Sequence, residues 1–304
     1  SRSWVKVYFL DDSATAVSCD TETTADDVVA LVADKIELVG NVSEYKLLEV
    51  KPDFVHILAD EDKPLQFKNE WTANKGGVTN RFVLKRMYFM DPNETFDDPV
   101  EKHLMFIQSR HSVATSRCYV EPELAMRLAA LYMQVEYGPH KPDIHVPGFL
   151  APHISQYIPA GLMRTKSVNE WESGVLQHHA SLTNFTRDQA VDAYIAELER
   201  LPHARIATFP AKYVQCGTNR MGTKVYIGVS SKGVHILDHP NMAVNGFYCY
   251  NSILSWGASV NSFSMSTDES PEGLRHTFET KEGVEISFTI QGYVTRILEQ
   301  INQE

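Results

Sequence analysis

The pattern of apolar and polar residues changes twice along the chain and divides it into three zones. In the first zone, β-rich runs at 4–9 and 14–19 flank the turn Asp11-Asp12-Ser13, which predicts a hairpin. Thr24 can cap a helix, and apolar residues recur at helical spacing after it. Further β-rich runs lie at 45–50, 54–58 and 81–87. Residues 68–80 are predicted to be a loop, so this zone should form strands around one helix.

The second zone, residues 88–204, carries helical patterns. Four helix starts are marked by suitable residues, namely Asp98-Pro99, Pro122, Ser167 with Glu170, and Thr186 with Gln189. Asp before Pro is typical of an N-cap followed by the first helical position, and the last two pairs fit the capping box. Gly138 is expected to end the helix that begins at Pro122. A loop rich in Pro and His follows at 139–152.

The third zone, residues 205–304, predicts strands closed by a helix. The expected strands are 208–214, 224–229, 233–238, 246–250, 253–257, 262–266 and 274–280. After Gly283, apolar residues follow the helical period as far as Ile301. These changes of periodicity predict three domains, 1–87, 88–204 and 205–304.

Composition and charge narrow the classes of function. The chain has 304 residues, with 43% apolar and 22% charged, which is ordinary for a globular protein. Its net charge of −11 disfavours a general nucleic-acid binder, which needs a basic surface. No apolar stretch approaches the roughly 20 residues of a membrane span, and the N-terminus lacks a signal-peptide pattern. Four scattered cysteines fit free thiols, so a cytoplasmic protein is expected.

Chemistry-bearing motifs are sparse. The sequence contains no P-loop, zinc-protease, nucleophile-elbow or kinase motif. No cysteine has sequence neighbours that would lower its pKa. Histidines that could suggest a metal are His140, His145, His153, His178 and His179. Because adjacent residues point to different faces of a helix, His178-His179 should not chelate, and the others are interpreted as surface or loop residues. We therefore expect no enzyme activity, no cofactor and no metal.

The order of the three zones resembles a FERM domain, and local motifs support this. The motifs are Asp98-Pro99-Val100, Gly138-Pro139-His140, Gly148-Phe149-Leu150, Tyr157-Ile158-Pro159, the run from Ile253 to Ser259, and Thr280 to Gly283. They are similar to talin-type FERM domains, and the third zone is also similar to MyTH4-FERM myosin tails. The resemblance implies an α+β multidomain fold. It would consist of a ubiquitin-like roll, a helical bundle like acyl-CoA-binding protein, and a PH/PTB-like β-sandwich with a C-terminal helix.

The resemblance also implies a function. It is that of a non-enzymatic adaptor linking membrane-receptor tails (NPxY-like, integrin-type) and acidic phospholipids to the actin cytoskeleton, peripheral at the plasma membrane. Two alternatives stay open, the cargo-binding FERM tail of an unconventional myosin and the regulatory FERM module of a tyrosine kinase or phosphatase.

A peptide groove is expected in the third zone. In PTB-like sandwiches the fifth strand is an edge beside the C-terminal helix, and an edge strand can pair with an extended peptide. The matching residues are Ser252, Ile253, Leu254, Ser255, Trp256, Gly257 and Ala258, with Ile286, Ile290 and Tyr293 on the helix. Trp256 is either a wall of the groove or a core residue. Ser255 stands where talin often has a basic residue.

Two further expectations concern charge. Five basic residues, Arg164, Lys166, Lys212, Arg220 and Lys224, lie where the family carries basic residues or meets acidic lipid. Weak, salt-sensitive phospholipid binding is expected, with a solvated face as the alternative. Acidic residues surround the second strand, which usually contacts Ras-type GTPases, so such a GTPase should be repelled. These residues are Asp11, Asp12, Asp20 and Glu22.

Overall fold

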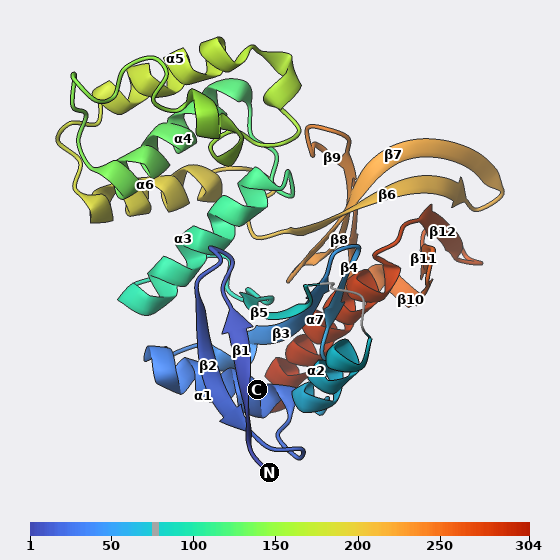
Figure 1. The fold of residues 1–304 in the computed structure, drawn as a ribbon. Helices are drawn as coiled ribbons and strands as arrows, with labels where there is room; N and C mark the ends of the chain where they lie inside the picture. Colours follow the sequence, from blue (N-terminus) through green and yellow to red (C-terminus); the bar gives the residue numbers. More distant parts are fainter. Residues whose placement is uncertain (75–78) are drawn as a thin grey trace.

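The computed structural model describes residues 1–74 and 79–304, which form three lobes (Figure 1). The first lobe contains β1 (Ser3–Tyr8), β2 (Ala14–Cys19), α1 (Ala25–Ile36), β3 (Tyr45–Lys51), β4 (Phe54–Ile57), α2 (Pro64–Ala73) and β5 (Arg81–Arg86). Its sheet has the order β2-β1-β5-β3-β4, with β1 and β5 parallel. This is the expected ubiquitin-like sheet. The capping box of α1 is present, since the Thr24 side chain accepts from the Asp27 N–H and the Asp27 side chain accepts from the Thr24 N–H.

The predicted loop over 68–80 is wrong in its first part, because α2 continues to Ala73. Pro64 occupies the first turn of this helix, and Leu65 is buried against the core. Trp71 donates its indole N–H to Glu49 Oε2 at 2.5 Å. Because α2 is largely polar, a search for apolar periodicity does not detect the contacts that Leu65 and Trp71 make. Residues 75–78, with Gly76-Gly77, lie outside the described residues.

The helical lobe contains α3 (Pro99–Ala114), α4 (Pro122–Tyr137), α5 (Val168–Ala180) and α6 (Arg187–Glu199), with short 3₁₀ turns at Ala151–Gln156 and Met163–Thr165. All four predicted starts are confirmed. Asp98 accepts from the Val100 N–H, and both capping boxes form. Gly138 ends α4 at a φ of 75°, a backbone conformation that glycine adopts at little cost.

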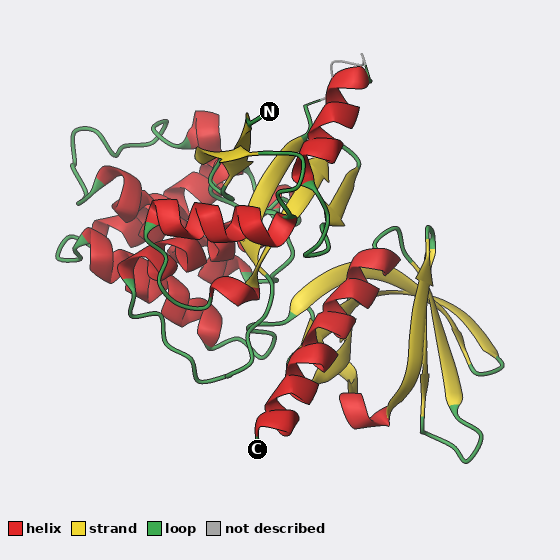
Figure 2. Cartoon of the chain, turned by 90° about the horizontal axis from the view of Figure 1, so that it is seen from below, coloured by secondary structure: helices red, strands yellow, loops and turns green. Residues whose placement is uncertain are grey.

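The third lobe contains β6 (Ala207–Cys216), β7 (Asn219–Ser230), β8 (Gly233–Asp238), β9 (Val244–Cys249), β10 (Ile253–Ser259), β11 (Ser262–Thr267), β12 (Leu274–Glu279) and α7 (Gly283–Gln303). All neighbouring strands are antiparallel, in the order β10-β11-β12-β6-β7-β8-β9. Figure 2 shows α7 lying across this sheet. The expected seven strands and closing helix are therefore present.

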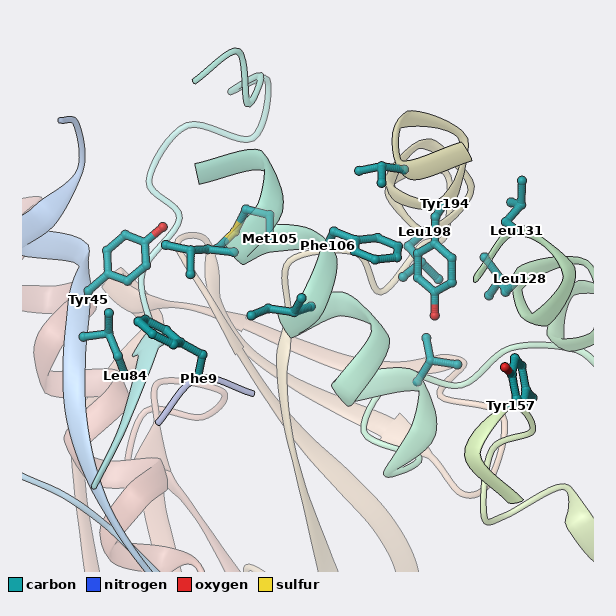
Figure 3. Close-up of a cluster of buried hydrophobic side chains, with 14 of the residues drawn as sticks. Phe9, Tyr45, Leu84, Met105, Phe106, Leu128, Leu131, Tyr157, Tyr194 and Leu198 are labelled. Carbon is teal, nitrogen blue, oxygen red and sulfur yellow. The ribbon is translucent and has the colours of Figure 1, made fainter. Parts of the chain in front are cut away.

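The hydrophobic core continues from lobe to lobe. In Figure 3, Phe9 and Leu84 of the first lobe belong to the same cluster as Phe106 of α3 and Tyr194 of α6. A second cluster joins the opposite face of the first sheet, with Val83 as one member, to the core of the third lobe. Each lobe thus completes part of another lobe's core.

The joint between the first and third lobes lies under the middle of α7. Tyr88 packs edge-on against Tyr293 with 5.0 Å between the ring centroids, and Tyr293 Oη accepts the Phe89 N–H at 3.2 Å. The Arg296 guanidinium stacks 3.7 Å from the Tyr88 ring centroid and pairs with Glu44 at 3.2 Å. These contacts fix α7 against the first lobe.

A buried ion-pair network joins the first lobe to the helical lobe. Arg86, at the end of β5, is 2% exposed. It pairs with Glu94 at 2.6 Å and with Glu101 of α3 at 2.5 Å. Its guanidinium also lies 4.4 Å from the centroid of the Phe89 ring. Because both carboxylates are largely desolvated, they depend on this one guanidinium for compensation.

Candidate functional site

The edge of the third-lobe sheet at β10 is the first candidate site. β10 stands at one end of the strand order, with β11 as its only strand neighbour among the described residues. The helix α7 packs against β10 on one face. The expected combination of an edge strand beside the closing helix is thus present. The backbone N–H and C=O groups on the open side of such a strand can pair with an extended peptide.

The strand register shows which way the β10 side chains point. Ile253 and Trp256 pair with Thr267 and Met265, which are buried, so they face the core. Trp256 is half-buried and packs on the second core cluster. Part of its ring therefore supports the core, and its role as a wall of the groove stays a prediction.

The other face of β10 is open. Ser255 and Gly257 pair with Ser266 and Ser264, which gives this face small residues. A Cβ atom added at Gly257 would have no heavy atom within 4 Å among the described residues beyond its chain neighbours. Leu254 lies at an irregularity of the pairing and is 62% exposed. Ser252 is half-buried and Ala258 is exposed.

The three helix residues assigned to the groove are core residues instead. Ile286, Ile290 and Tyr293 are 0%, 0% and 1% exposed and belong to the second core cluster. Their spacing marks the face of α7 that packs on the sheet, and a ligand cannot contact them directly. Val284, 50% exposed in the first turn of α7, is the apolar helix residue open to solvent near β10.

A thiol lies at the start of this edge. Cys249 is exposed, and its Sγ lies 3.2 Å from Ser252 Oγ. Hydrogen bonds from the side chain and the backbone N–H of Ser252 lower the pKa of this thiol. The expectation that no cysteine has a lowered pKa is therefore wrong. The cause is a turn of three residues, which a search for neighbouring basic residues does not detect.

The five basic residues fall into two groups, and all are exposed. Lys212 on β6 and Lys224 on β7 are directly opposite each other, and Arg220 lies farther along the same hairpin. Arg164 and Lys166 lie on the helical lobe, within and just after the turn Met163–Thr165. None of the five belongs to an ion pair within residues 1–74 and 79–304.

The acidic residues around β2 are partly neutralised. Asp12 pairs with Arg81 at 2.9 Å, and Glu22 pairs with Lys63 at 2.8 Å. Asp20 lies 3.9 Å from Arg2. These pairs reduce the repulsion on which the GTPase expectation rests, and weak GTPase binding stays a prediction.

A cluster of three histidines is the second candidate site. His140, His145 and His179 each place one ring nitrogen within 4.8 Å of the other two. Burial lowers the pKa of His179 and of His145, and the neighbouring imidazoles lower both further. His140 and His145 lie in the loop after α4, as expected, but His145 is buried and His140 is half-buried rather than at the surface. His153 is exposed, as expected.

The rejection of His178-His179 as a chelating pair agrees with the geometry. His178 turns outward and pairs with Glu123 at 2.8 Å, while His179 is fully buried. The sequence signal for the cluster was the pair of histidines in the loop after α4. The third member comes from α5, and only the packing of that helix brings it close.

Three protein-family profiles match the chain. They are described as RA like domain over residues 1–89, FERM central domain over 91–209, and PTB domain (IRS-1 type) over 212–298. No described helix has the length and apolar character needed to cross a membrane.

Relatives are similar over different shares of the chain. Talin of Oscarella pearsei is 26% identical over 97% of this chain, and talin-1 of Gallus gallus is 24% identical over 97%. FERM domain-containing protein B of Dictyostelium discoideum is 31% identical over 60% of it. The chain spans 12% of either talin and 39% of the Dictyostelium protein.

Solved structures share the fold. The human myosin 7b C-terminal MyTH4-FERM domain, in complex with the harmonin-a PDZ3 domain, has a TM-score of 0.78 at 19% identity, covering 98% of this chain and 61% of that one. The complex of the FERM and C-terminal domains of Drosophila Merlin has a TM-score of 0.72 at 20% identity, covering 99% and 98%. Since three profiles follow in order along the chain and talin aligns over 97% of it, the chain has the three lobes of a FERM domain and is similar to talin over nearly its whole length.

Proposed function

We propose that this chain is a non-enzymatic adaptor module that captures the cytoplasmic tail of a membrane receptor as an added strand along β10. The observation that carries the proposal is the open edge itself, where β10 has one strand neighbour and an exposed apolar residue, Leu254. Backbone pairing supplies affinity for an extended peptide, and side-chain contacts select its sequence. We also propose that the boundaries between the three lobes lie near residues 87 and 205.

The chemistry of the edge favours a short apolar or NPxY-like tail. The peptide-facing residues are Leu254, the exposed part of Trp256 and Val284 of α7. Among them, Trp256 is of a residue type that is a frequent anchor in binding sites. Since Ser255 offers no positive charge, an acidic tail gains nothing at that position, and apolar contact sets the preference.

Acidic phospholipids are the second proposed partner. Lys212 and Lys224 present adjacent positive charges on the β6–β7 hairpin, and Arg220 extends the group. Each basic residue near an anionic surface contributes about 1 kcal/mol, so binding should be weak and sensitive to salt. This contact would hold the module at the inner face of the plasma membrane, where receptor tails and the cytoskeleton meet.

A cargo-binding role of the kind found in myosin tails is the second candidate. It is favoured by the fold, since the MyTH4-FERM domain of myosin 7b is a structural neighbour and was solved with a PDZ partner. A module of this kind would bind a folded cargo protein rather than a receptor tail.

The peptide proposal is tested on the full chain by fluorescence polarisation with a labelled NPxY-like peptide. Leu254→Ser should weaken binding about tenfold, because the exposed apolar contact at the start of the edge is lost. Phe247→Ser is the matched control, since Phe247 is 46% exposed on β9 at the opposite edge. A loss of binding with Phe247→Ser and not with Leu254→Ser would disprove the β10 site.

The lipid proposal is tested by co-sedimentation with phosphoinositide vesicles at low and high salt. The double variant Lys212→Gln/Lys224→Gln should lower the bound fraction at low salt. Lys232→Gln, an exposed lysine in the β7–β8 turn, is the control and should have no effect. Binding that is equal at both salt concentrations would contradict an electrostatic contact.

A further inference from the structure

Three imidazole rings from two separate segments meet inside the helical lobe. His140 and His145 lie in the loop after α4, and His179 lies in the last turn of α5. The ring centroids are separated by 5.8, 5.7 and 4.9 Å. His179 is 0% exposed, His145 is 5% exposed, and His140 is half-buried.

The His179 ring is held by a hydrogen bond through one nitrogen, and its other nitrogen is free. Its Nε2 lies 2.9 Å from the Gly138 carbonyl, so Nε2 carries the proton and donates it. The lone pair is then on Nδ1, which is buried without a hydrogen-bond partner among the described residues. A histidine held through one nitrogen by a backbone carbonyl is the usual arrangement of a metal ligand.

His140 provides a second free nitrogen. Its Nδ1 is also buried and has no hydrogen-bond partner in the described part of the chain. Two buried imidazole nitrogens without a partner in one cluster of rings are unusual, since buried polar atoms are nearly always satisfied. A ligand bound by the cluster would satisfy both.

His145 completes the cluster. Its Nδ1 accepts the Lys141 N–H at 2.8 Å, so as a ligand it would give up this bond and turn its ring toward the other two. The loop that carries it is held to α5 by a neighbouring contact. The Glu172 carboxylate accepts the backbone N–H groups of Gly148, Leu150 and Ala151 at 2.6–2.8 Å. The loop is thereby fixed against the helix that supplies His179.

We propose that His140, His145 and His179 form a binding site for a transition-metal cation, Zn²⁺ foremost, with a fourth position open to water. The three rings contribute only nitrogen donors, a set that suits Zn²⁺ and disfavours Mg²⁺ and Ca²⁺. Bonds of 2.0–2.1 Å in a tetrahedral site place the nitrogens about 3.3 Å apart and the ring centres about 5 Å apart. The ligand nitrogens now lie within 4.8 Å of one another, so metal binding requires them to move closer together and the His145 ring to turn.

The bound metal would cross-link two segments of the helical lobe. It would join the Pro/His loop to the end of α5, at a distance from the β10 edge along the chain and in another lobe. The site is therefore independent of the proposed peptide function, and either can fail without the other.

The test uses the full chain, stripped with a chelator and titrated with Zn²⁺ against a competing chromogenic chelator. We expect one tightly bound Zn²⁺ per chain and binding at least tenfold weaker for His140→Gln and for His179→Gln. Co²⁺ should give the visible absorption of a four-coordinate ion bound by three imidazole nitrogens and a water. Zn²⁺ at about a hundredfold excess over Kd should raise the Tm by roughly 5 °C.

The controls are His178→Gln and His153→Gln, which change neighbouring histidines outside the cluster and should bind Zn²⁺ as the parent does. If His179→Gln does not fold, His140→Gln decides the question, because His140 is half-exposed. Parent protein that binds Zn²⁺ no more tightly than His140→Gln would overturn the proposal. So would a crystal grown with Zn²⁺ that shows only water between the rings and no anomalous signal.

Discussion

Two glycines in the third lobe show how differently its two sides are built. A Cβ atom added at Gly292 of α7 would overlap the Tyr88 hydroxyl, whereas one added at Gly257 of β10 would meet no heavy atom within 4 Å among the described residues beyond its chain neighbours. The first glycine lies in the joint with the first lobe, and the second lies on the open edge. The joint is closely packed and the edge is not, so stability should depend on the joint and binding on the edge.

The largest loss of stability is expected at the buried ion-pair network between the first lobe and the helical lobe. Arg86→Ala leaves Glu94 and Glu101 without their common cation and should lower the free energy of unfolding by about 3–5 kcal/mol. Arg200→Ala is the control and should cost less than about 1 kcal/mol, because Arg200 is exposed and its partner Glu197 keeps a second cation, Arg127. Urea unfolding midpoints measure both. Equal losses would show that the Arg86 network does not hold the lobes.

The next largest change in stability is expected from substituting the two glycines, Gly292 and Gly257. Gly292→Ala should destabilise the protein by about 2–3 kcal/mol through overpacking against Tyr88, despite the better helix propensity of alanine. Gly257→Ala should change stability by less than about 0.5 kcal/mol, as a surface substitution does. Thermal unfolding of the two variants compares joint and edge directly, and similar Tm values for both would contradict the comparison.

Acid should destabilise the third lobe through a buried histidine of β8, which packs against Phe247. Burial lowers the pKa of His235 to about 4, with a further contribution from Lys232. In the unfolded chain the group titrates near 6.5, so the unfolded state binds more protons between pH 6.5 and 4. Stability should therefore fall by about 1–2 kcal/mol as the pH drops from 6.5 to 4.5. His235→Gln should remove this part of the slope in unfolding curves, and an unchanged slope would contradict the assignment.

The smallest expected change in stability concerns the β6–β7 hairpin. Lys212 and Lys224 are like charges directly opposite each other, an arrangement that weakens a sheet. Lys224→Glu should raise stability by about 0.2–1 kcal/mol and at the same time reduce vesicle binding. A gain in stability with undiminished lipid binding would show that this hairpin does not meet the membrane.

Local features of the fold could be predicted from the sequence because they depend on neighbouring residues. The capping boxes at Ser167 and Thr186 are examples, since their residues and their partners lie within one turn. Helix α2 was missed because its anchors, such as the bond from Trp71 to Glu49, come from distant strands.

The candidate sites were less accessible to sequence reasoning. The family resemblance locates the edge strand, but periodicity identifies the apolar stripe of α7 without showing what covers it, so the expectation for Ile286 is wrong. The histidine cluster needs the packing of α5 against a loop about 35 residues earlier in the chain, and no local pattern reports that contact.

The joint under α7 also has a consequence for how the protein is made. Phe89 and Tyr293, which share a hydrogen bond, are 204 residues apart in the chain. At synthesis rates of about 5–20 residues per second, the first lobe leaves the ribosome roughly 10–40 s before α7 does. During that interval Tyr88 lacks the helix that packs on it, and Val83 lacks the third-lobe part of its core cluster. The nascent first lobe is thus an incomplete body with an exposed apolar face, and a chaperone that shields this face should raise the yield of folded protein.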